Sequence, residues 1–204
     1  MPKKTANRYH HGDLYDALIS HASTMISELG IEALSLRKLA EQIGVSRTAA
    51  YHHFKDKNDL LCAIATQGFI AWQSQSESIF SNDELTTQEK YRNFVHDYVH
   101  FATKNPALYD LMFGRTIWKN SQSTQTLRDV AYPSFQYQVE MTKIWQAQGL
   151  MPKNESTLRL AQVTWGTLHG IARLLIDGIY ADASNIDEMC ECAVNLFLLH
   201  TPSK

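Results

Sequence analysis

The sequence predicts an all-α protein of about nine helices, and three observations lead to this fold class. Apolar residues recur at steps of three and four along most of the chain, as they do on one face of an α-helix. The alternation typical of a β-strand is absent over any useful length, and the chain has no internal repeat. Glycine, proline and N-capping residues stand between the periodic stretches, where helices begin and end.

The N-terminal part predicts three short helices. In the first of these helices, apolar residues recur at helical spacing as far as Gly30. Glycine is a residue type that often ends helices. Residues 35–57 then indicate two helices joined by a tight turn at Gly44, with Ser35 and Ser46 as N-caps. Such a pair is the helix-turn-helix that fits a DNA major groove; the alternative is an ordinary helical hairpin with a solvated face.

The second helix of this pair carries polar groups on one side. Arg47, Thr48, Tyr51 and His52 sit at i, i+1, i+4 and i+5, so they share one face of a short helix. These side chains can hydrogen-bond or stack, which is what sequence readout at base edges requires. The spacing therefore favours a DNA-reading face.

The remainder of the chain predicts six more helices. Their approximate ranges are 57–80, the stretch around 91–101, a short helix after Asn105 and Pro106, 127–148, 155–181 and 186–200. Gly149 and the apolar Leu150 mark the end of the seventh helix. Pro133 either kinks that helix or marks its true start.

Several motifs resemble the tetracycline-repressor (TetR) family of bacterial regulators. Residues 44–57, Gly-Val-Ser-Arg-Thr-Ala-Ala-Tyr-His-His-Phe-Lys-Asp-Lys, followed by Asp-Leu-Leu at 59–61, are similar to the signature of that family. The Tyr-His-His-Gly-Asp-Leu run at 9–14 and the Leu-Ser-Leu-Arg-Lys-Leu-Ala run at 34–40 are typical of one branch. Trp-Gly-Thr-Leu-His-Gly at 165–170 resembles a Trp-His-Gly motif in the C-terminal domain of the same branch.

The resemblance implies two domains: a helix-turn-helix DNA-binding domain over residues 1–57 and a helical effector-binding and dimerisation domain over 58–204. It further implies a homodimeric transcriptional regulator, a repressor rather than an activator. A small apolar or aromatic effector would release it from a palindromic operator. Double-stranded DNA and the effector are then the expected partners, and no cofactor is expected.

The expected DNA contacts combine the polar face with positions that the resemblance adds. The resemblance places Thr48, Tyr51 and His52 among positions that touch DNA, and Lys57 on the phosphate backbone. Phosphate contacts position a protein, whereas base contacts specify sequence. Arg37 is equally consistent with a surface salt bridge. The full set of candidates is Arg37, Arg47, Thr48, Tyr51, His52, His53 and Lys57.

The charge balance has the sign that this division requires. Residues 1–57 carry eight Lys or Arg against six Asp or Glu, a net charge of +2. Residues 58–204 carry eleven against fifteen, a net charge of -4. The bias is modest, so charge supports nucleic acid as a partner of the first domain without identifying it.

Aromatic residues concentrate in the second domain, where seventeen of the 21 follow Lys57. Small-molecule sites are concave, aromatic-lined and common between helices. For any single residue, an ordinary core position is the alternative. The candidate effector-binding residues are Trp72, Phe94, Tyr98, Phe101, Tyr109, Phe113, Trp118, Phe135, Met141 and Trp145.

The last two helices carry apolar stripes at steps of three and four, a pattern that suits packing against another helix. Two such helices from each of two chains predict a four-helix dimer interface; the alternative is packing inside one chain. The residues assigned to this interface are Trp165, Leu168, His169, Ala172, Leu175, Ile179, Met189, Ala193 and Leu196.

Other classes of protein find little support. No nucleophile motif, Walker loop, zinc-protease motif or dinucleotide fingerprint is present, so we expect no catalytic residues; a helical adaptor without DNA binding remains the competing class. Adjacent histidines on a helix diverge by about 100°, so we expect no metal site at the His-His pairs. Three sparse cysteines, no apolar signal sequence and no membrane-length apolar run predict a cytoplasmic protein with reduced thiols.

Overall fold

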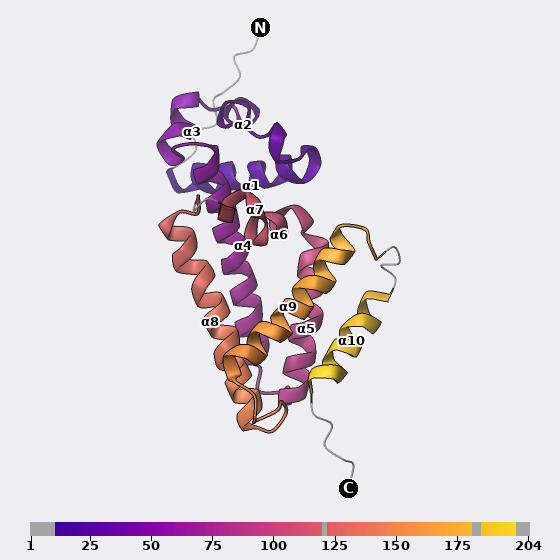
Figure 1. Cartoon of the computed structure of the whole chain (residues 1–204). Helices are drawn as coiled ribbons and strands as arrows, with labels where there is room; N and C mark the ends of the chain where they lie inside the picture. Colours follow the sequence, from indigo (N-terminus) through magenta and orange to yellow (C-terminus); the bar gives the residue numbers. More distant parts are fainter. Residues whose placement is uncertain (1–10, 120–121, 181–184, 199–204) are drawn as a thin grey trace. The chain divides into compact units, whose positions relative to one another are not determined.

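The structure of the chain is a computed structural model that describes residues 11–119, 122–180 and 185–198, and for residues 11–13 it describes the backbone alone. These residues form helices and connecting turns without any strand (Figure 1). The all-α prediction is therefore confirmed for the described part of the chain. Contacts divide the chain into two compact units: residues 1–68 with 107–129, and residues 69–106 with 130–204.

The first unit contains α1 (His11–Leu29), the 3₁₀ turn η1 (Ile31–Ala33), α2 (Leu36–Ile43) and α3 (Arg47–His53). It also includes the first half of α4 (Lys57–Phe80), most of α6 (Pro106–Phe113), α7 (Arg115–Trp118) and the first turn of α8 (Gln125–Ala147). Its division from the second unit falls within α4 and α8, not at residue 57. The boundary at residue 57 is a functional expectation and stays a prediction.

Burial explains how the first unit holds together. Leu18, Leu39 and Leu60 are fully buried, one each on α1, α2 and α4. At Gly68, a β-carbon would lie 2.7 Å from the Met112 Sδ atom, so any larger residue there would require the Met112 side chain to move. Removing these apolar surfaces from water is the main stabilising contribution to the unit.

The second unit is built around α5 (Thr87–Lys104), which packs against α9 (Thr157–Ile176) and α10 (Ile186–Phe197). A capping box starts α5: the Thr86 hydroxyl accepts from the Glu89 backbone N–H, and the Glu89 carboxylate accepts from the Thr86 N–H. The Thr86 hydroxyl also donates to the Glu89 carboxylate at 2.7 Å, and this bond, together with the one from the Thr86 N–H, lowers the pKa of Glu89. The second half of α4 and most of α8 complete the unit.

Several predicted helix ends agree with the structure, but α9 ends at Ile176 and not near residue 181, and α10 ends at Phe197 and not near residue 200. Helix α5 ends at Lys104 and α6 begins at Pro106, as the Asn-Pro pair indicated. Gly149 has φ +78° directly after α8, and the Leu150 N–H donates to the Trp145 carbonyl at 2.9 Å. Pro133 lies inside α8, so it does not begin the helix. The helix that the sequence pattern missed is the four-residue α7.

Helix length and apolarity also bear on membranes. Among the described residues, none of the helices combines the length and the apolar content that a membrane crossing requires.

Candidate nucleic-acid interface and effector region

The turn between α2 and α3 has the geometry that the sequence predicted. Gly44 adopts the left-handed conformation, φ 74° and ψ 28°, which an L-residue with a β-carbon adopts only under strain. Ser35 caps α2 by accepting from the Lys38 N–H at 3.2 Å, and Ser46 caps α3 by accepting from the Ala49 N–H at 3.1 Å. Both predicted N-caps are confirmed, and together they fix where α3 begins.

The inner side of α3 is small and apolar. Ala50 is fully buried, and Phe54, which directly follows the helix, is 2% exposed. The Phe54 ring stacks on Tyr15 of α1 with ring centroids 5.2 Å apart. The α3 helix is thus anchored through Ala50 and Phe54, and the rotation of the helix about its axis is set.

That rotation presents the predicted polar face to solvent. Arg47, Thr48, Tyr51 and His52 are all exposed, and the Tyr51 side chain retains 54% of its accessible surface. His53 differs, because it is half-buried and its ring lies 6.0 Å from Tyr15. The four exposed groups share one face, and His53 packs beside the core.

Basic groups flank this face in the sequence. Arg37 and Lys38 are exposed in the first turn of α2, and Lys57 is the half-buried first residue of α4. Asp56 accepts a hydrogen bond from the Asp59 N–H at 2.9 Å, which caps the start of α4. Helix N-termini and lysines are the usual partners of phosphate. Residues 1–10, which include the motif residues Tyr9 and His10, lie outside the described residues.

Six of the predicted effector residues contribute to the aromatic core of the second unit. Trp72 contacts Phe94, Tyr98 and Phe101 with ring centroids 5.8, 5.1 and 5.6 Å apart. The two remaining members, Phe135 and Trp145, extend this cluster. The Phe135 ring packs on Trp165 with ring centroids 5.2 Å apart, and the Trp165 indole N–H donates to the Tyr98 hydroxyl at 2.7 Å. The Trp145 ring packs on Phe94 with ring centroids 6.0 Å apart.

Three other predicted effector residues belong to the first unit. Tyr109 and Phe113 pack against each other at 4.8 Å, and the Trp118 indole N–H donates to the Met112 carbonyl at 2.7 Å. The ten candidates are therefore divided between the two units, because the α6–α7 segment belongs to the first. The sequence pattern gave no indication of this division.

The second unit also contains a cleft of about 580 Å³. Of the predicted residues, Met141 and Trp145 line it. Sequence reasoning missed the other lining residues, although Tyr137 continues the Met141–Trp145 stripe at four-residue spacing. They are Glu77, Phe80, Ser81, Thr87, Lys90, Tyr137, Ile144 and Gln148.

Three buried polar atoms of the second unit have no hydrogen-bond partner among the described residues: Ser76 Oγ, the Tyr91 hydroxyl and Gln138 Nε2. The Tyr91 ring contacts a residue that lines the cleft, and Ser76 and Gln138 lie on α4 and α8, two helices that supply lining residues. Ser76 precedes the lining residue Phe80 by one helical turn, Gln138 directly follows lining residue Tyr137, and Tyr91 packs edge-on against Trp145 at 4.8 Å. Burial raises the pKa of Tyr91 well above its usual range.

The apolar stripes of α9 and α10 require a correction. Leu168 and Ala172 are fully buried within the chain and Ala193 is 3% exposed, so these three do not form a surface for a second chain. The Trp165 indole contacts are likewise internal. The sequence prediction placed these residues in the dimer interface because an apolar pattern indicates that a helix face is covered, but it does not indicate which chain covers it.

The other assigned residues are at least partly accessible. Leu175, Met189 and His169 are half-buried, and burial together with the Arg173 charge lowers the pKa of His169. Ile179 is 68% exposed and Leu196 is 75% exposed. The outward side of α9 further exposes Val163, Gly166 and the partly exposed Gly170; space for a β-carbon is open at both glycines.

Comparison with protein families accounts for most of the chain. The family model described as "Bacterial regulatory proteins, tetR family" matches residues 18–64. A second, described as "Tetracyclin repressor-like, C-terminal domain", matches residues 91–197, which is more than half of the chain. The first match contains α2, α3 and their turn, and the second contains most of α5 and all of α9 and α10.

Individual relatives agree with these matches. Tetracycline repressor protein class C of Escherichia coli is 44% identical over 50 residues, which is 24% of this chain and 23% of that protein. The chain therefore aligns with only about a quarter of the length of that repressor. Nucleoid occlusion factor SlmA of Photobacterium profundum is 27% identical over 145 residues, 67% of this chain and 71% of that protein.

Solved structures share the fold over nearly the whole chain. A protein with unknown function from Rhodococcus sp. RHA1 superposes with a TM-score of 0.82 and 30% identity, covering 94% of this chain and 96% of that one. The fatty acid degradation regulator FadR from Bacillus halodurans gives a TM-score of 0.73 at 17% identity, covering 93% and 95%. At that identity the second likeness concerns the fold alone.

Proposed function

The chain belongs to the tetR family of bacterial regulatory proteins, and from that premise we propose that it is a sequence-specific DNA-binding transcriptional regulator. Family membership points to a regulator rather than an enzyme. The observation that carries the proposal is the outer face of α3, where Arg47, Thr48, Tyr51 and His52 are all exposed. The helix is held by its inner residues, so this face is free to enter a groove of DNA.

The chemistry of these four residues suits base recognition. Arg47 has the fork geometry that pairs with the O6 and N7 atoms of guanine, and Thr48 offers both a hydroxyl and a methyl group. Tyr51 and His52 stack on or hydrogen-bond to bases or phosphates. Lys57 and Arg37 contribute phosphate contacts that position the helix without specifying sequence. His53 supports α3 through its contacts with Tyr15 and Phe54.

The proposed regulator is a homodimer that binds a palindromic operator, since a two-fold dimer with one reading helix in each chain reads an inverted repeat. The interface we propose is the outward side of α9 and α10, because their inward sides are covered within the chain. Val163, Gly166 and Gly170 supply an apolar strip on α9 with room for a neighbouring helix, and Leu196 adds an exposed apolar side chain on α10.

We place the effector in the cleft lined by Phe80, Tyr137, Met141 and Trp145. Aromatic and thioether surfaces favour an apolar or aromatic molecule. The unpartnered Tyr91 hydroxyl belongs to a ring that packs on the lining residue Trp145, and the unpartnered Ser76 and Gln138 groups lie on helices that supply the lining. Buried polar groups normally have partners. An effector with one or two polar atoms would satisfy some of them, which gives the site a means of fixing orientation. The three groups are Ser76 Oγ, the Tyr91 hydroxyl and Gln138 Nε2.

Repression and release follow if the effector favours a state that binds operator poorly. A ligand shifts an equilibrium only through different affinities for its two states, so an indifferent ligand changes nothing. By linkage, operator DNA must weaken effector binding by the same factor, typically about 5- to 150-fold.

Fluorescence anisotropy with labelled DNA tests the proposal directly. The purified chain is titrated against DNA upstream of its own gene and against a shuffled duplex, at several salt concentrations. We expect tighter binding to the upstream DNA and a steep loss of affinity as salt rises, because phosphate contacts release counterions. Equal affinity for both duplexes, or no dependence on salt, would indicate a helical adaptor without specific DNA binding.

The effector site has a separate test. Tryptophan fluorescence, to which Trp145 contributes from the cleft wall, reports binding in a screen of apolar and aromatic compounds. The Tyr91→Phe variant removes only an unpartnered hydroxyl, so its fold should be unaffected while its affinity for a polar-substituted hit falls. A hit whose affinity is the same in Tyr91→Phe and in the presence of operator would contradict both the site and the coupling.

A further inference from the structure

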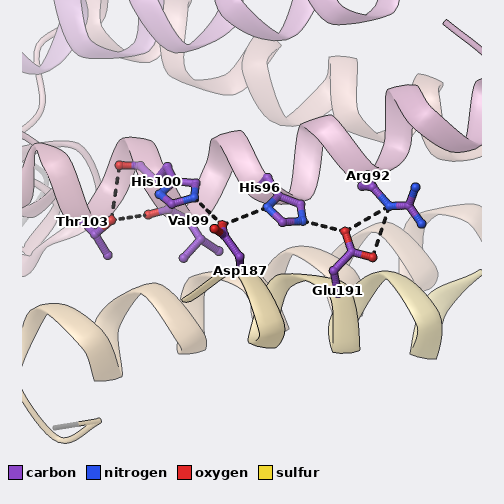
Figure 2. A network of polar contacts seen from close by, with 7 residues as sticks. All are labelled: Arg92, His96, Val99, His100, Thr103, Asp187 and Glu191. Atoms are coloured by element: carbon purple, nitrogen blue, oxygen red, sulfur yellow. Dashed lines mark hydrogen bonds and ion pairs between the residues drawn. The ribbon is translucent and has the colours of Figure 1, made fainter. Parts of the chain in front are cut away.

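A cluster of polar residues joins α5 to α10 (Figure 2). It shares no residue with the proposed DNA-binding face or with the lining of the cleft. His96 and His100 lie one turn apart on α5, and Asp187 and Glu191 lie one turn apart on α10. The Asp187 Oδ1 atom is 3.2 Å from His96 Nδ1 and 2.8 Å from His100 Nε2. Two imidazoles from one helix thus converge on a single carboxylate oxygen of another.

This donor set matches the ligands of divalent transition metals. One ligand atom from each of His96, His100 and Asp187 lies within 4.8 Å of the other two. A tetrahedral Zn²⁺ with bonds of about 2.0–2.2 Å holds its ligand atoms roughly 3.3 Å apart. Small side-chain rotations close that difference, because the two histidines already face the same oxygen (Figure 2).

The surroundings of the cluster also suit a metal. Glu191 Oε1 accepts a hydrogen bond from His96 Nε2 at 2.9 Å, and Arg92 Nε lies 3.0 Å from the same oxygen. A carboxylate on the nitrogen opposite the metal-binding one is the usual partner that orients a metal-bound histidine. The side chains of His96 and His100 are 21% and 33% exposed, so an ion can enter and retain a water molecule.

We propose that a divalent transition-metal cation of the Zn²⁺ class binds here through His96 Nδ1, His100 Nε2 and Asp187 Oδ1. Glu191 orients His96, and water occupies the fourth position. The ion replaces the hydrogen bonds that now join the imidazoles to Asp187 and ties α10 to α5. Because it binds the folded second unit, it stabilises that unit by mass action. The set differs from the adjacent His-His pairs, for which helical geometry predicts no shared metal site.

Calorimetric titration of the tag-free, chelator-treated chain with Zn²⁺, Co²⁺ or Mg²⁺ at about pH 7.5, where most imidazoles are neutral, tests the assignment. We expect Zn²⁺ and Co²⁺ to bind and Mg²⁺, which prefers oxygen ligands, to bind far more weakly. Bound Co²⁺ should show the visible absorption of a four-coordinate site. Zn²⁺ should also raise the thermal unfolding midpoint.

Matched double variants separate this site from other histidines in the chain. His96→Ala/His100→Ala should lose one equivalent of Zn²⁺, whereas His10→Ala/His11→Ala should retain it. Glu191→Gln should keep the stoichiometry and weaken affinity by about 10–100-fold. Circular dichroism checks that each variant is folded.

Two results would overturn the proposal. One is a wild-type chain that binds Zn²⁺ no better than Mg²⁺, which would leave the cluster as a hydrogen-bonded contact between helices. The other is an equivalent of Zn²⁺ that survives in folded His96→Ala/His100→Ala but disappears in His10→Ala/His11→Ala.

Discussion

Helix α3 carries a stripe of polar residues and helix α9 carries a stripe of apolar residues, and the two stripes differ in their exposure to solvent. The polar stripe of α3 is left in solvent, with Tyr51 54% exposed, while the centre of the apolar stripe of α9 is covered by its own chain, with Leu168 and Ala172 fully buried. A polar stripe that the fold leaves uncovered is available for a partner. An apolar stripe indicates burial alone, and the burial can be entirely internal.

The largest expected effect tests the buried stripe. Leu168→Ala should lower the free energy of unfolding by about 2–5 kcal/mol, because it removes transfer energy and leaves a cavity. Val163→Ala on the exposed side of the same helix should change the stability of the monomer by no more than about 0.5 kcal/mol. Urea denaturation of both variants at several protein concentrations checks the contrast. Similar losses for the two variants would show that the two sides of α9 are not distinguished as described.

The next effect concerns the exposed stripe. Tyr51→Ala and His52→Ala should each weaken operator binding by about 1–3 kcal/mol while leaving the urea midpoint nearly unchanged. Lys57→Ala should weaken specific and non-specific binding alike and reduce the salt slope by about one. Anisotropy titrations measure both quantities. Full operator affinity in both Tyr51→Ala and His52→Ala would remove α3 from the reading role.

Glycines of the two regions should respond with opposite signs. Gly44→Ala forces a β-carbon into the left-handed conformation and should destabilise the first unit by about 1–2 kcal/mol. Gly166→Ala has open space within a helix and should stabilise the chain by up to about 1 kcal/mol. If α9 forms the dimer contact, Gly166→Ala also weakens the dimer in sedimentation experiments. A destabilised Gly166→Ala monomer would contradict the open space found at that position.

The smallest effect is a pH dependence at His169. Burial, aided by the Arg173 charge, lowers the pKa of this imidazole below the ordinary 6.5, so the folded chain favours the neutral form. The unfolded chain therefore binds more protons as the pH falls through that value, and this part of the stability is present above it and lost below it. His169→Gln should show a smaller difference in urea midpoint between about pH 7.5 and pH 5.5. An unchanged difference would exclude the contribution.

Local chemistry explains what sequence reasoning predicted well. Ser35, Gly44 and Ser46 act through hydrogen bonds and backbone angles within a few residues, so their roles are readable without a tertiary structure. The same holds for Gly149 at the end of α8. The exposure of the polar face of α3 could also be predicted, because a short helix that buries Ala50 on one side turns its other side toward solvent.

The features that the sequence prediction missed depend on the tertiary arrangement of the helices. Trp118 and Trp72 were both predicted to line the effector site, yet the contacts within the chain assign them to different units. Tyr91 and Gln138 combine burial with unpartnered polar atoms, a property that only a packed structure reveals. The pairing of His96 with Asp187 spans 91 residues and depends on the packing of α5 against α10.

Selection of bound duplexes from a random DNA pool tests the reading role of α3 most directly. The wild-type chain should recover an inverted repeat, since a symmetric dimer reads two equivalent half-sites. His52→Ala should relax the preference at a defined base pair in each half-site, whereas Lys57→Ala should recover the same repeat with lower affinity. Recovery of one unchanged motif by wild type, His52→Ala, Tyr51→Ala and Arg47→Ala alike would contradict sequence readout by the outer face of α3.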